Sequence, residues 1–139
     1  MSAALPGGVV VDTDVVSYLF KGDTRSDLYR PHLDGQITVI AAQTRAELEH
    51  WALKNNWGTA RVDLLRAELR KYVFAPPTEA TCLRWAQIMD NAKRTGRPIS
   101  TADAWVAATA LTYAAPLVTH NDKDFKGVPG LTIVTENKP

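Results

Sequence analysis

The sequence has little cysteine, no long apolar run and no leader-like start, and each absence excludes a class of protein. Cys82 is the only cysteine among the 139 residues, so one chain cannot form a disulfide framework, and a reducing compartment is favoured. No apolar run approaches the roughly 20 residues that span a bilayer. The opening MSAALPGG lacks the basic and long apolar regions of a signal peptide. We therefore expect a cytoplasmic protein that does not enter membranes.

A strong net charge of either sign is also missing. Lys+Arg number 16 and Asp+Glu number 15, which gives a formal net charge of +1 and a pI near 7.9. This balance excludes a protein that coats nucleic acid through overall positive charge, so contact with a polyanion would depend on local patches. The 45% of hydrophobic and 22% of charged residues are typical of a globular protein, and we expect residues 1–139 to form a single domain.

Several common catalytic motifs do not occur in the sequence. The chain has no G-x-S-x-G elbow, no P-loop and no G-x-G-x-x-G fingerprint. The segment ELEH at 47–50 is not the H-E-x-x-H helix of zinc proteases. Cys82 lies within a predicted helix without a nearby histidine base, so we interpret it as a small core residue.

Short apolar runs alternate with helical patterns along the chain. Runs typical of strands lie at 8–12, 37–42, 72–77, 116–120 and 131–136, the last as a candidate edge strand. Helical patterns lie at about 12–22, 25–35, 44–55, 59–71, 78–96 and 100–115. We expect Pro31 to interrupt the second helix, the fourth helix to be amphipathic, and Thr78 and Gly96 to cap the fifth. Strands that alternate with helices predict a three-layer α/β/α sandwich around a mostly parallel central sheet.

Acidic residues recur where a strand pattern gives way to a helix. They are Asp12, Glu47, Asp103, and one of Asp122 and Asp124. Ligand sites of parallel α/β folds gather at the carboxyl ends of the strands, so we expect these side chains to converge. Oxygen ligands without histidine or cysteine suit a hard cation such as Mg²⁺ or Mn²⁺. Because such an ion mostly supports phosphoryl chemistry, the pattern indicates a candidate nuclease.

Each of these acids also has a purely structural interpretation. The segments 44–47, 100–103 and 121–124 have the spacing of capping boxes, in which an acid bonds back to the helix start. Asp12 or Asp14 could cap the first helix in the same way. Capping alone does not explain why all four positions are junctions between strands and helices, and an acid at a helix start can serve both purposes.

Four segments carry these acids in a characteristic order. They are VVVDTDVVSYLF, TRAELEHWA, ISTADAWVAATAL and LVTHNDKDFKGVPGL. Together they resemble the motifs of PIN-domain ribonucleases of the VapC toxin type, the toxic half of a bacterial toxin–antitoxin pair. The resemblance covers nearly the full length, and the order of the motifs and the DF…VPGL tail make it specific. It implies a PIN-like fold for the single domain 1–139.

The resemblance implies a role for several individual residues. Asp12 and Asp103 correspond to the metal-binding aspartates of the family. Glu47 corresponds to an acid that binds the metal directly or through water, and we assign it a catalytic role. Thr13 and Thr119 correspond to small hydroxyl residues that often line the same pocket.

The fourth acid of the site is assigned to Asp124, with Asp122 as the rival. Family members commonly carry asparagine at the position of Asn121 and an acid just before the aromatic residue, here Phe125. From a cap at Asn121, Asp124 would point back toward the strand end, whereas Asp122 would face solvent. We expect Asp124 to act with Glu47 in orienting the attacking water.

The resemblance further implies a function and partners. The chain is expected to hydrolyse phosphodiester bonds of RNA with Mg²⁺ or Mn²⁺, and thereby to block translation. A VapB-like antitoxin would occlude the acidic pocket, and the toxin would form a homodimer. Arg94 and Arg97 are the better candidates for contacts with RNA phosphates, because they precede the helix of Asp103. The alternatives are a non-catalytic PIN-fold binding module and a metal-dependent nuclease that acts on DNA.

Overall fold

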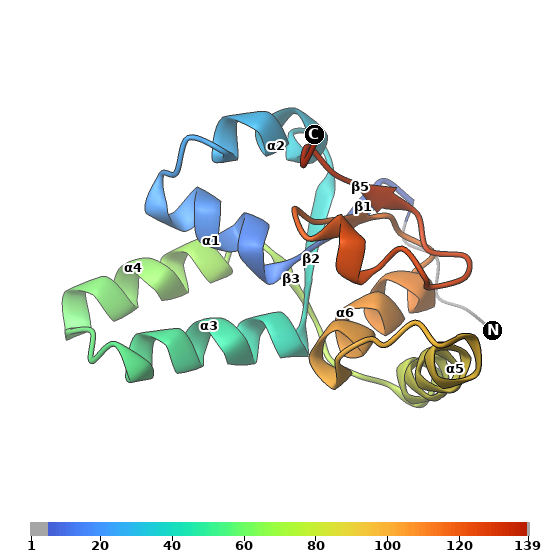
Figure 1. Ribbon diagram of the computed structural model, residues 1–139. Helices are drawn as coiled ribbons and strands as arrows, with labels where there is room; N and C mark the ends of the chain where they lie inside the picture. The colour runs from blue at the N-terminus through green and yellow to red at the C-terminus, as the bar shows by residue number, and fades with distance from the viewer. Residues whose placement is uncertain (1–5, 139) are drawn as a thin grey trace.

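In the computed structural model, which describes residues 6–138, five short parallel strands form one sheet in the order β3-β2-β1-β4-β5 (Figure 1). The strands are β1 (Gly8–Val11), β2 (Ile37–Ala41), β3 (Val73–Ala75), β4 (Leu117–Val118) and β5 (Ile133–Val134). The predicted parallel sheet and the edge position of the last strand are confirmed. The expectation about a signal peptide concerns opening residues that lie partly outside the described range.

In the described part of the chain, six α-helices and one short 3-10 turn connect and cover the strands (Figure 1). They are α1 (Thr13–Lys21), α2 (Ser26–Leu33), α3 (Ala42–Lys54), α4 (Thr59–Leu69), α5 (Glu79–Thr95), α6 (Thr101–Thr112) and the turn η1 (Asp122–Asp124). None of the helices within residues 6–138 is long and apolar enough to cross a membrane.

Successive residues of the central strand β1 face opposite helical layers. Val10 packs on one side, in a cluster with Ile88 of α5 and Ala107 of α6. Val9 and Val11 pack on the other side, with apolar residues of α1 to α4. Side chains alternate along a strand, and all of β1 is buried, so both faces of the sheet are covered. The predicted three-layer α/β/α sandwich is therefore confirmed.

The capping residues predicted for α5 are confirmed by the geometry of its ends. The Thr78 hydroxyl accepts a hydrogen bond from the N–H of Thr81, and a reciprocal bond from the Thr78 N–H completes a capping box. Gly96 ends the helix with φ +67°, in the left-handed region that glycine adopts without steric strain.

Two helices differ from the sequence-based expectation. Pro31 lies inside α2 rather than interrupting it, because the short helix is held by burial of Tyr29 and Leu33 in the core. The helix α4 is not strongly amphipathic: Leu65 and Leu69 are buried, but Leu64 is 64% exposed. Tertiary packing overrides local pattern at both helices.

The interpretation of Cys82 as a core residue is wrong. Its side chain is exposed on α5, and it forms no disulfide. The helix buries Thr81 and Ile88 instead, and one residue of sequence separation rotates a side chain by roughly 100° around a helix. The face of α5 that carries Cys82 therefore points to solvent.

The strand order brings β1 and β4 side by side. The chain leaves β1 toward β2 on one side of the sheet and returns to β4 on the other. The backbone N–H of Asp12 donates to the carbonyl of Val118 at 2.9 Å, which continues the pairing past the strand ends. In open parallel sheets, ligands bind in the crevice where the strand order reverses. The fold thus locates the crevice beside Asp12.

Candidate active site

An acidic pocket of about 410 Å³ lies at the carboxyl end of β1. Three of the predicted site residues contribute to it: Asp12 and Asp103 from the starts of α1 and α6, and Glu47 from within α3. Its lining consists of Asp12, Thr13, Asp14, Ser17, Lys21, Glu47, Leu48, Trp51, Asp103 and Asn121. The expected convergence of these three acids is confirmed in the geometry, and their chemical roles stay predictions.

Both carboxylate oxygens of Asp12 accept hydrogen bonds. It is the N-cap of α1, and its Oδ1 accepts the backbone N–H of Thr13 at 2.8 Å. Its Oδ2 accepts the hydroxyl of Thr119 at 2.7 Å, across the junction between β1 and β4. Thr13 lines the pocket as expected, whereas Thr119 is fully buried behind Asp12. Asp12 is only 6% exposed, and the two hydrogen bonds fix the orientation of its carboxylate.

Glu47 is not part of a capping box, so the structural interpretation of the segment 44–47 is wrong. The helix α3 already begins at Ala42, which leaves Thr44 and Glu47 inside it. The Thr13 hydroxyl lies 3.1 Å from Thr44 Oγ1 and 3.2 Å from Glu47 Oε1. Because this hydroxyl has a single proton, it donates to one of the two oxygens at a time. Thr13 thus connects Glu47 to the start of α1, next to Asp12.

Asp103 lies in the first turn of α6 and combines a capping contact with a place in the pocket. The Ser100 hydroxyl caps the helix by accepting the Asp103 N–H at 3.0 Å. This contact is one of the two bonds of the predicted box, and it leaves the carboxylate of Asp103 directed at the pocket lining. The helix start therefore sets the position of the acid.

Asp14 is a pocket residue that the sequence interpretation considered only as a cap. Its Oδ1 accepts the N–H of Val15 at 2.7 Å, and its Oδ2 accepts the N–H of His120 at 3.1 Å. The second bond ties the start of α1 to the segment after β4. The repeated acid in D-T-D directly after a buried strand was the sequence signal that could have indicated it.

The two candidates for the fourth acid lie in environments opposite to those that we expected, namely Asp122 facing solvent and Asp124 pointing inward. Asp122 is buried and not free to solvent: its carboxylate accepts the amide of Asn137 at 3.3 Å and lies 3.6 Å from the ammonium of Lys126. Asp124 is the exposed residue of the pair. Neither lines the acidic pocket, although Asp124 is close enough to influence Asp103 through its charge.

The turn that carries both candidates is held by its neighbours. Phe125 is fully buried, so the expected aromatic anchor is confirmed. Asn121 precedes η1, and its carbonyl accepts the N–H of Asp124 at 3.1 Å, but its side chain does not cap the turn. The side chain of Asn121 lines the acidic pocket instead. The cap at Asn121 from which we argued for Asp124 is therefore absent from the described turn, and the assignment of the fourth acid to Asp124 stays a prediction.

Crowding of carboxylates in a buried place changes their protonation. Burial, followed by the charge of Asp14, raises the pKa of Asp12 from 3.8 to about 7. Hydrogen bonds from Thr119 and Thr13 lower this pKa, and the charge of Asp103 raises it. Burial is also the main reason that the pKa values of Asp14 and Asp103 are raised.

The carboxylates of the acidic pocket form no ion pair within residues 6–138. Lys21 lines the pocket, but its ammonium lies over the ring of Trp51, 5.0 Å from the ring centre. None of the ion pairs in this part of the chain involves Asp12, Asp14, Glu47 or Asp103. The pocket therefore has the electrostatic character of a site for a cation.

The donor set could hold a hard divalent ion that keeps part of its water shell. In the described part of the chain, no three histidine, cysteine, aspartate or glutamate side chains lie close enough together to coordinate a metal ion by themselves. Mg²⁺ commonly binds to proteins through one or two carboxylates and retains several waters. Asp12 and Asp103 supply carboxylates of this kind, so the residues fit such an ion.

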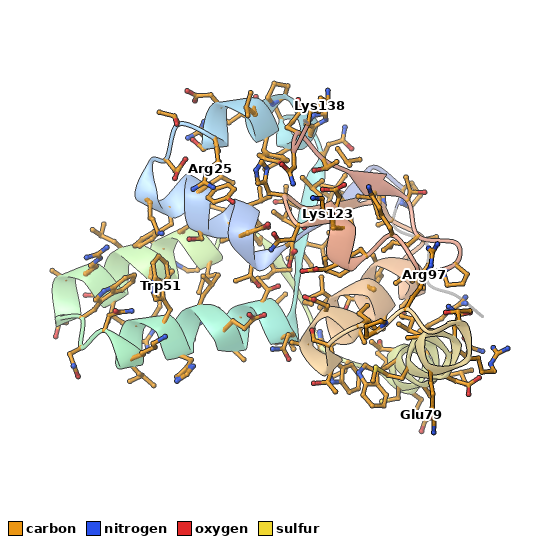
Figure 2. The ribbon with its side chains drawn as sticks, in the orientation of Figure 1. Arg25, Trp51, Glu79, Arg97, Lys123 and Lys138 are labelled. Carbon is orange, nitrogen blue, oxygen red and sulfur yellow. The ribbon has the colours of Figure 1, made fainter. Side chains whose placement is uncertain are left out.

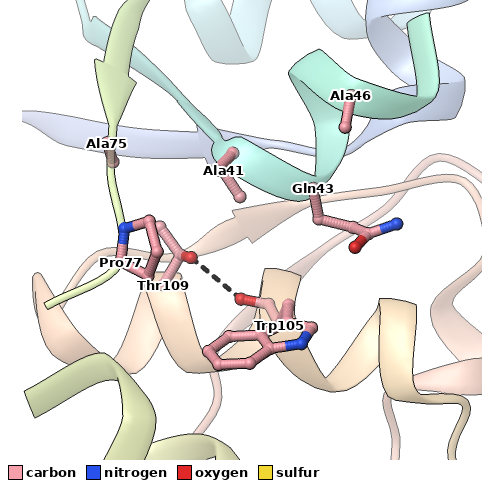
Figure 3. A pocket seen from close by; sticks show the side chains of 8 residues that line it. Ala41, Gln43, Ala46, Ala75, Pro77, Trp105 and Thr109 are labelled. Carbon is pink, nitrogen blue, oxygen red and sulfur yellow. Dashed lines mark hydrogen bonds between the residues drawn. The ribbon is translucent and has the colours of Figure 1, made fainter. Parts of the chain in front are cut away.

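A second cavity, of about 240 Å³, adjoins the start of α3 but lacks charged groups (Figure 3). Its polar lining consists of Gln43 and Thr109, and the Thr109 hydroxyl donates to the carbonyl of Trp105 at 2.8 Å (Figure 3). Alanine, proline and tryptophan side chains form the rest of the wall. Without an acid, base or nucleophile it offers no hydrolytic chemistry, and the acidic pocket remains the candidate active site.

Comparison with known proteins identifies the family to which this arrangement belongs. The sequence profile of the PIN domain family matches residues 9–131, a range that contains all the acidic positions above. This chain belongs to the PIN domain family. The resemblance that the sequence motifs indicated is therefore confirmed.

Individual PIN domain relatives match over most of their length. Ribonuclease VapC1 of Haemophilus influenzae is 27% identical over 88% of this chain and 92% of its own. Ribonuclease VapC of Rickettsia bellii is 28% identical over 92% of this chain and 96% of its own. The structure of VapBC-1 from nontypeable Haemophilus influenzae contains a chain with 26% identity and a TM-score of 0.81, over 94% of this chain and 99% of that one.

Proposed function

We propose that this PIN domain protein is a divalent-metal-dependent endoribonuclease that acts as the toxin of a toxin–antitoxin pair. The observation that carries the proposal is the convergence of Asp12, Glu47 and Asp103 in one pocket, where none of the three forms an ion pair within residues 6–138. The VapC relatives, which are named ribonucleases, support RNA as the substrate. A cytoplasmic location follows from that substrate.

The proposed cofactor is Mg²⁺ or Mn²⁺, bound by Asp12 and Asp103. When bound, such an ion neutralises charge on a phosphate and lowers the pKa of a coordinated water. Asp12 is suited to binding because the contacts to Thr13 and Thr119 fix its two oxygens and leave further lone pairs for a ligand. Asp103 is suited because the cap at Ser100 holds its backbone.

Glu47 and Asp124 are proposed to orient the attacking water and to handle its proton. Glu47 faces the same pocket, and the Thr13 hydroxyl restrains it at 3.2 Å. A carboxylate near a phosphodiester can accept a hydrogen bond from water and so align it for in-line attack. Asp124 would act from a position near Asp103. The charge of Asp124 raises the pKa of Asp103, which indicates this proximity.

The proposed partners are a VapB-like antitoxin and a second copy of the toxin. The Haemophilus structure is a VapBC-1 assembly, and this chain corresponds to one member of it. An antitoxin arginine fits the acidic pocket, because a guanidinium fork matches carboxylate geometry and its charge would replace that of the metal. Inhibition would then consist of occlusion of the pocket.

The test is cleavage of RNA by the purified protein in the presence and absence of divalent ions. We expect cleavage with Mg²⁺ or Mn²⁺ and none with EDTA, and we expect single-stranded DNA of the same sequence to remain intact. Cleavage of the DNA alone would favour the DNA nuclease alternative. Stable binding of an antitoxin without cleavage of any nucleic acid would favour the binding module.

A further inference from the structure

A basic cleft of about 430 Å³ lies between α5, the loop from α5 to α6, and the segment after η1. Its floor is apolar, and its rim carries positive charge. The floor includes Ile88, Ile99 and Val128, and the rim includes the cations Arg97, Lys123 and Lys126 together with one carboxylate, Asp124. Figure 2 labels Arg97 and Lys123, which extend from the loop after α5 and from η1. The volume lies within the roughly 300–1,000 Å³ of small-ligand sites.

Two of the rim cations have no partner within residues 6–138. The side chains of Arg97 and Lys123 take part in none of the hydrogen bonds or ion pairs of this part of the chain. Lys126 pairs with Asp122 at 3.6 Å but is 63% exposed. Two unpaired cations beside an apolar floor favour a ligand with an anionic group and a flat apolar part.

The stem of Arg97 is held against the wall of the cleft. A Cβ added at Gly127 would lie 3.0 Å from Cδ and 3.4 Å from Cβ of Arg97, so the arginine stem packs directly on the backbone there. The amide of Asn91 donates to the carbonyl of Gly127 at 3.3 Å and fixes that backbone. The guanidinium is therefore presented from a supported position, which lowers the entropy cost of binding an anion.

The basic cleft adjoins the acidic pocket through two segments that serve both. The loop of Arg97 leads directly to Ser100, which caps α6 beside Asp103. Asp124 lines the cleft, and its charge also raises the pKa of Asp103. A nucleic-acid chain that leaves the acidic pocket past Asp124 would therefore enter the cleft.

We propose that the basic cleft binds one nucleotide of the single-stranded RNA, next to the phosphate that is cleaved. Arg97 and Lys123 contact its backbone phosphate, and the unstacked base rests on the apolar floor at Ile99. Phosphate contacts position a nucleic acid, and proteins recognise single-stranded RNA through bases turned out of the stack. This inference rests on the proposed ribonuclease function and adds the path of the substrate.

The first test measures RNA binding without cleavage, by fluorescence anisotropy of a labelled single-stranded RNA in EDTA at several salt concentrations. In the double variant R97Q/K123Q, we expect Kd to rise at least about 10-fold. Each lost phosphate contact should also reduce the slope of log K against log salt by about 0.7. The charge-keeping variant R97K/K123R should retain most of the affinity and the slope.

The matched control is K54Q/R70Q, which removes the same charge from two exposed residues at the ends of α3 and α4. We expect a change in Kd of less than about twofold, because these residues lie outside the cleft. Equal losses of RNA affinity in both double variants would mean that the protein attracts RNA only through its overall charge. Unchanged affinity in R97Q/K123Q would mean that Arg97 and Lys123 do not contact the RNA. Either result overturns the proposal.

A second measurement uses the unaltered protein and therefore does not depend on folding of a variant. RNA that carries a photoreactive 4-thiouridine is crosslinked in EDTA, and the attached peptides are identified by mass spectrometry. We expect crosslinks in 96–99 or 126–128. Crosslinks confined to α3 and α4 would overturn the proposal.

The outcomes for the cleft and for the proposed function can be told apart. If the protein cleaves RNA but R97Q/K123Q binds it normally, the ribonuclease function stands and the cleft proposal fails. If no RNA is cleaved with any divalent ion but R97Q/K123Q still loses RNA binding, the cleft stands as an RNA site and the ribonuclease function fails.

Discussion

At the scale of single residues, Asp12 and Asp103 are the acids on which catalysis should depend most. Asp12→Asn and Asp103→Asn each keep the shape of the side chain and remove a charged ligand, so we expect RNA cleavage to fall at least about 100-fold. The fold should be retained, because the asparagine oxygen can accept the N–H of Thr13 and its amide N–H can donate to the hydroxyl of Thr119. A gel assay and a circular dichroism melt measure both effects, and activity within a few-fold of the parent would contradict the metal assignment.

The raised pKa of Asp12 predicts that the stability of the metal-free protein depends on pH. The folded state binds the Asp12 proton more tightly than the unfolded state between the ordinary value of 3.8 and about 7. The free energy of unfolding should therefore fall as pH rises through this window. Thermal melts in EDTA from about pH 5 to about pH 8 measure it.

The control for this pH dependence is Asp12→Asn, which cannot titrate at this position. The melting temperature of the unaltered protein should fall relative to the variant as pH rises. Added Mg²⁺ should raise the melting temperature of the unaltered protein more at pH 8 than at pH 5, because ion binding requires the carboxylate form. Parallel curves for the two proteins in EDTA would refute a raised pKa at Asp12.

A pair of alanine substitutions tests whether Asp124 or Asp122 is the fourth acid of the active site. Asp124→Ala should greatly reduce cleavage with little effect on stability, because Asp124 is exposed and near Asp103. Asp122→Ala should lower stability by about 1 kcal/mol with near-normal cleavage, because it loses contacts to Asn137 and Lys126. Cleavage assays and urea unfolding measure the pair, and the opposite pattern would assign the role to Asp122.

At the scale of elements, the start of α6 connects helix stability to the site. Ser100→Ala removes the hydroxyl that accepts the Asp103 N–H at 3.0 Å, and loss of an N-cap costs about 1 kcal/mol. We expect a lower urea midpoint and a weaker Mn²⁺ affinity, because the first turn that carries Asp103 frays. Ser100→Asp, which can also cap, should restore the stability. A stable Ser100→Ala protein would show that packing alone holds this turn.

At the scale of the whole molecule, the protein should associate with itself and with an antitoxin. Co-expression with the small reading frame expected beside the gene should give a complex that does not cleave RNA. Replacement by alanine of the antitoxin arginine that faces the acidic pocket should restore cleavage. Light scattering of the toxin alone should give the mass of a dimer. A strict monomer, or a complex with the pocket open, would contradict these expectations.

The sequence by itself determined the order of strands and helices and the two ends of α5. The buried run in β1 predicted a strand covered on both faces, and Thr78 and Gly96 predicted the ends of α5. These features depend on local chemistry: apolar runs, a hydroxyl that caps backbone N–H groups, and a residue that tolerates positive φ. The acids Asp12 and Asp103 were also found locally, because both lie at the first turn of a helix that follows a strand or loop.

Only the tertiary structure decided which elements are neighbours and which side chains face one another. Parallel strands are joined by long crossovers, so no local signal places β4 beside β1 or Thr119 against Asp12. The D-T-D repeat marks Asp14 as a candidate, but only the tertiary structure shows that Asp14 lines the pocket and accepts the N–H of His120. The exchange of burial between Asp122 and Asp124 has the same cause, because one residue of shift in a tight turn reverses which side chain meets the core.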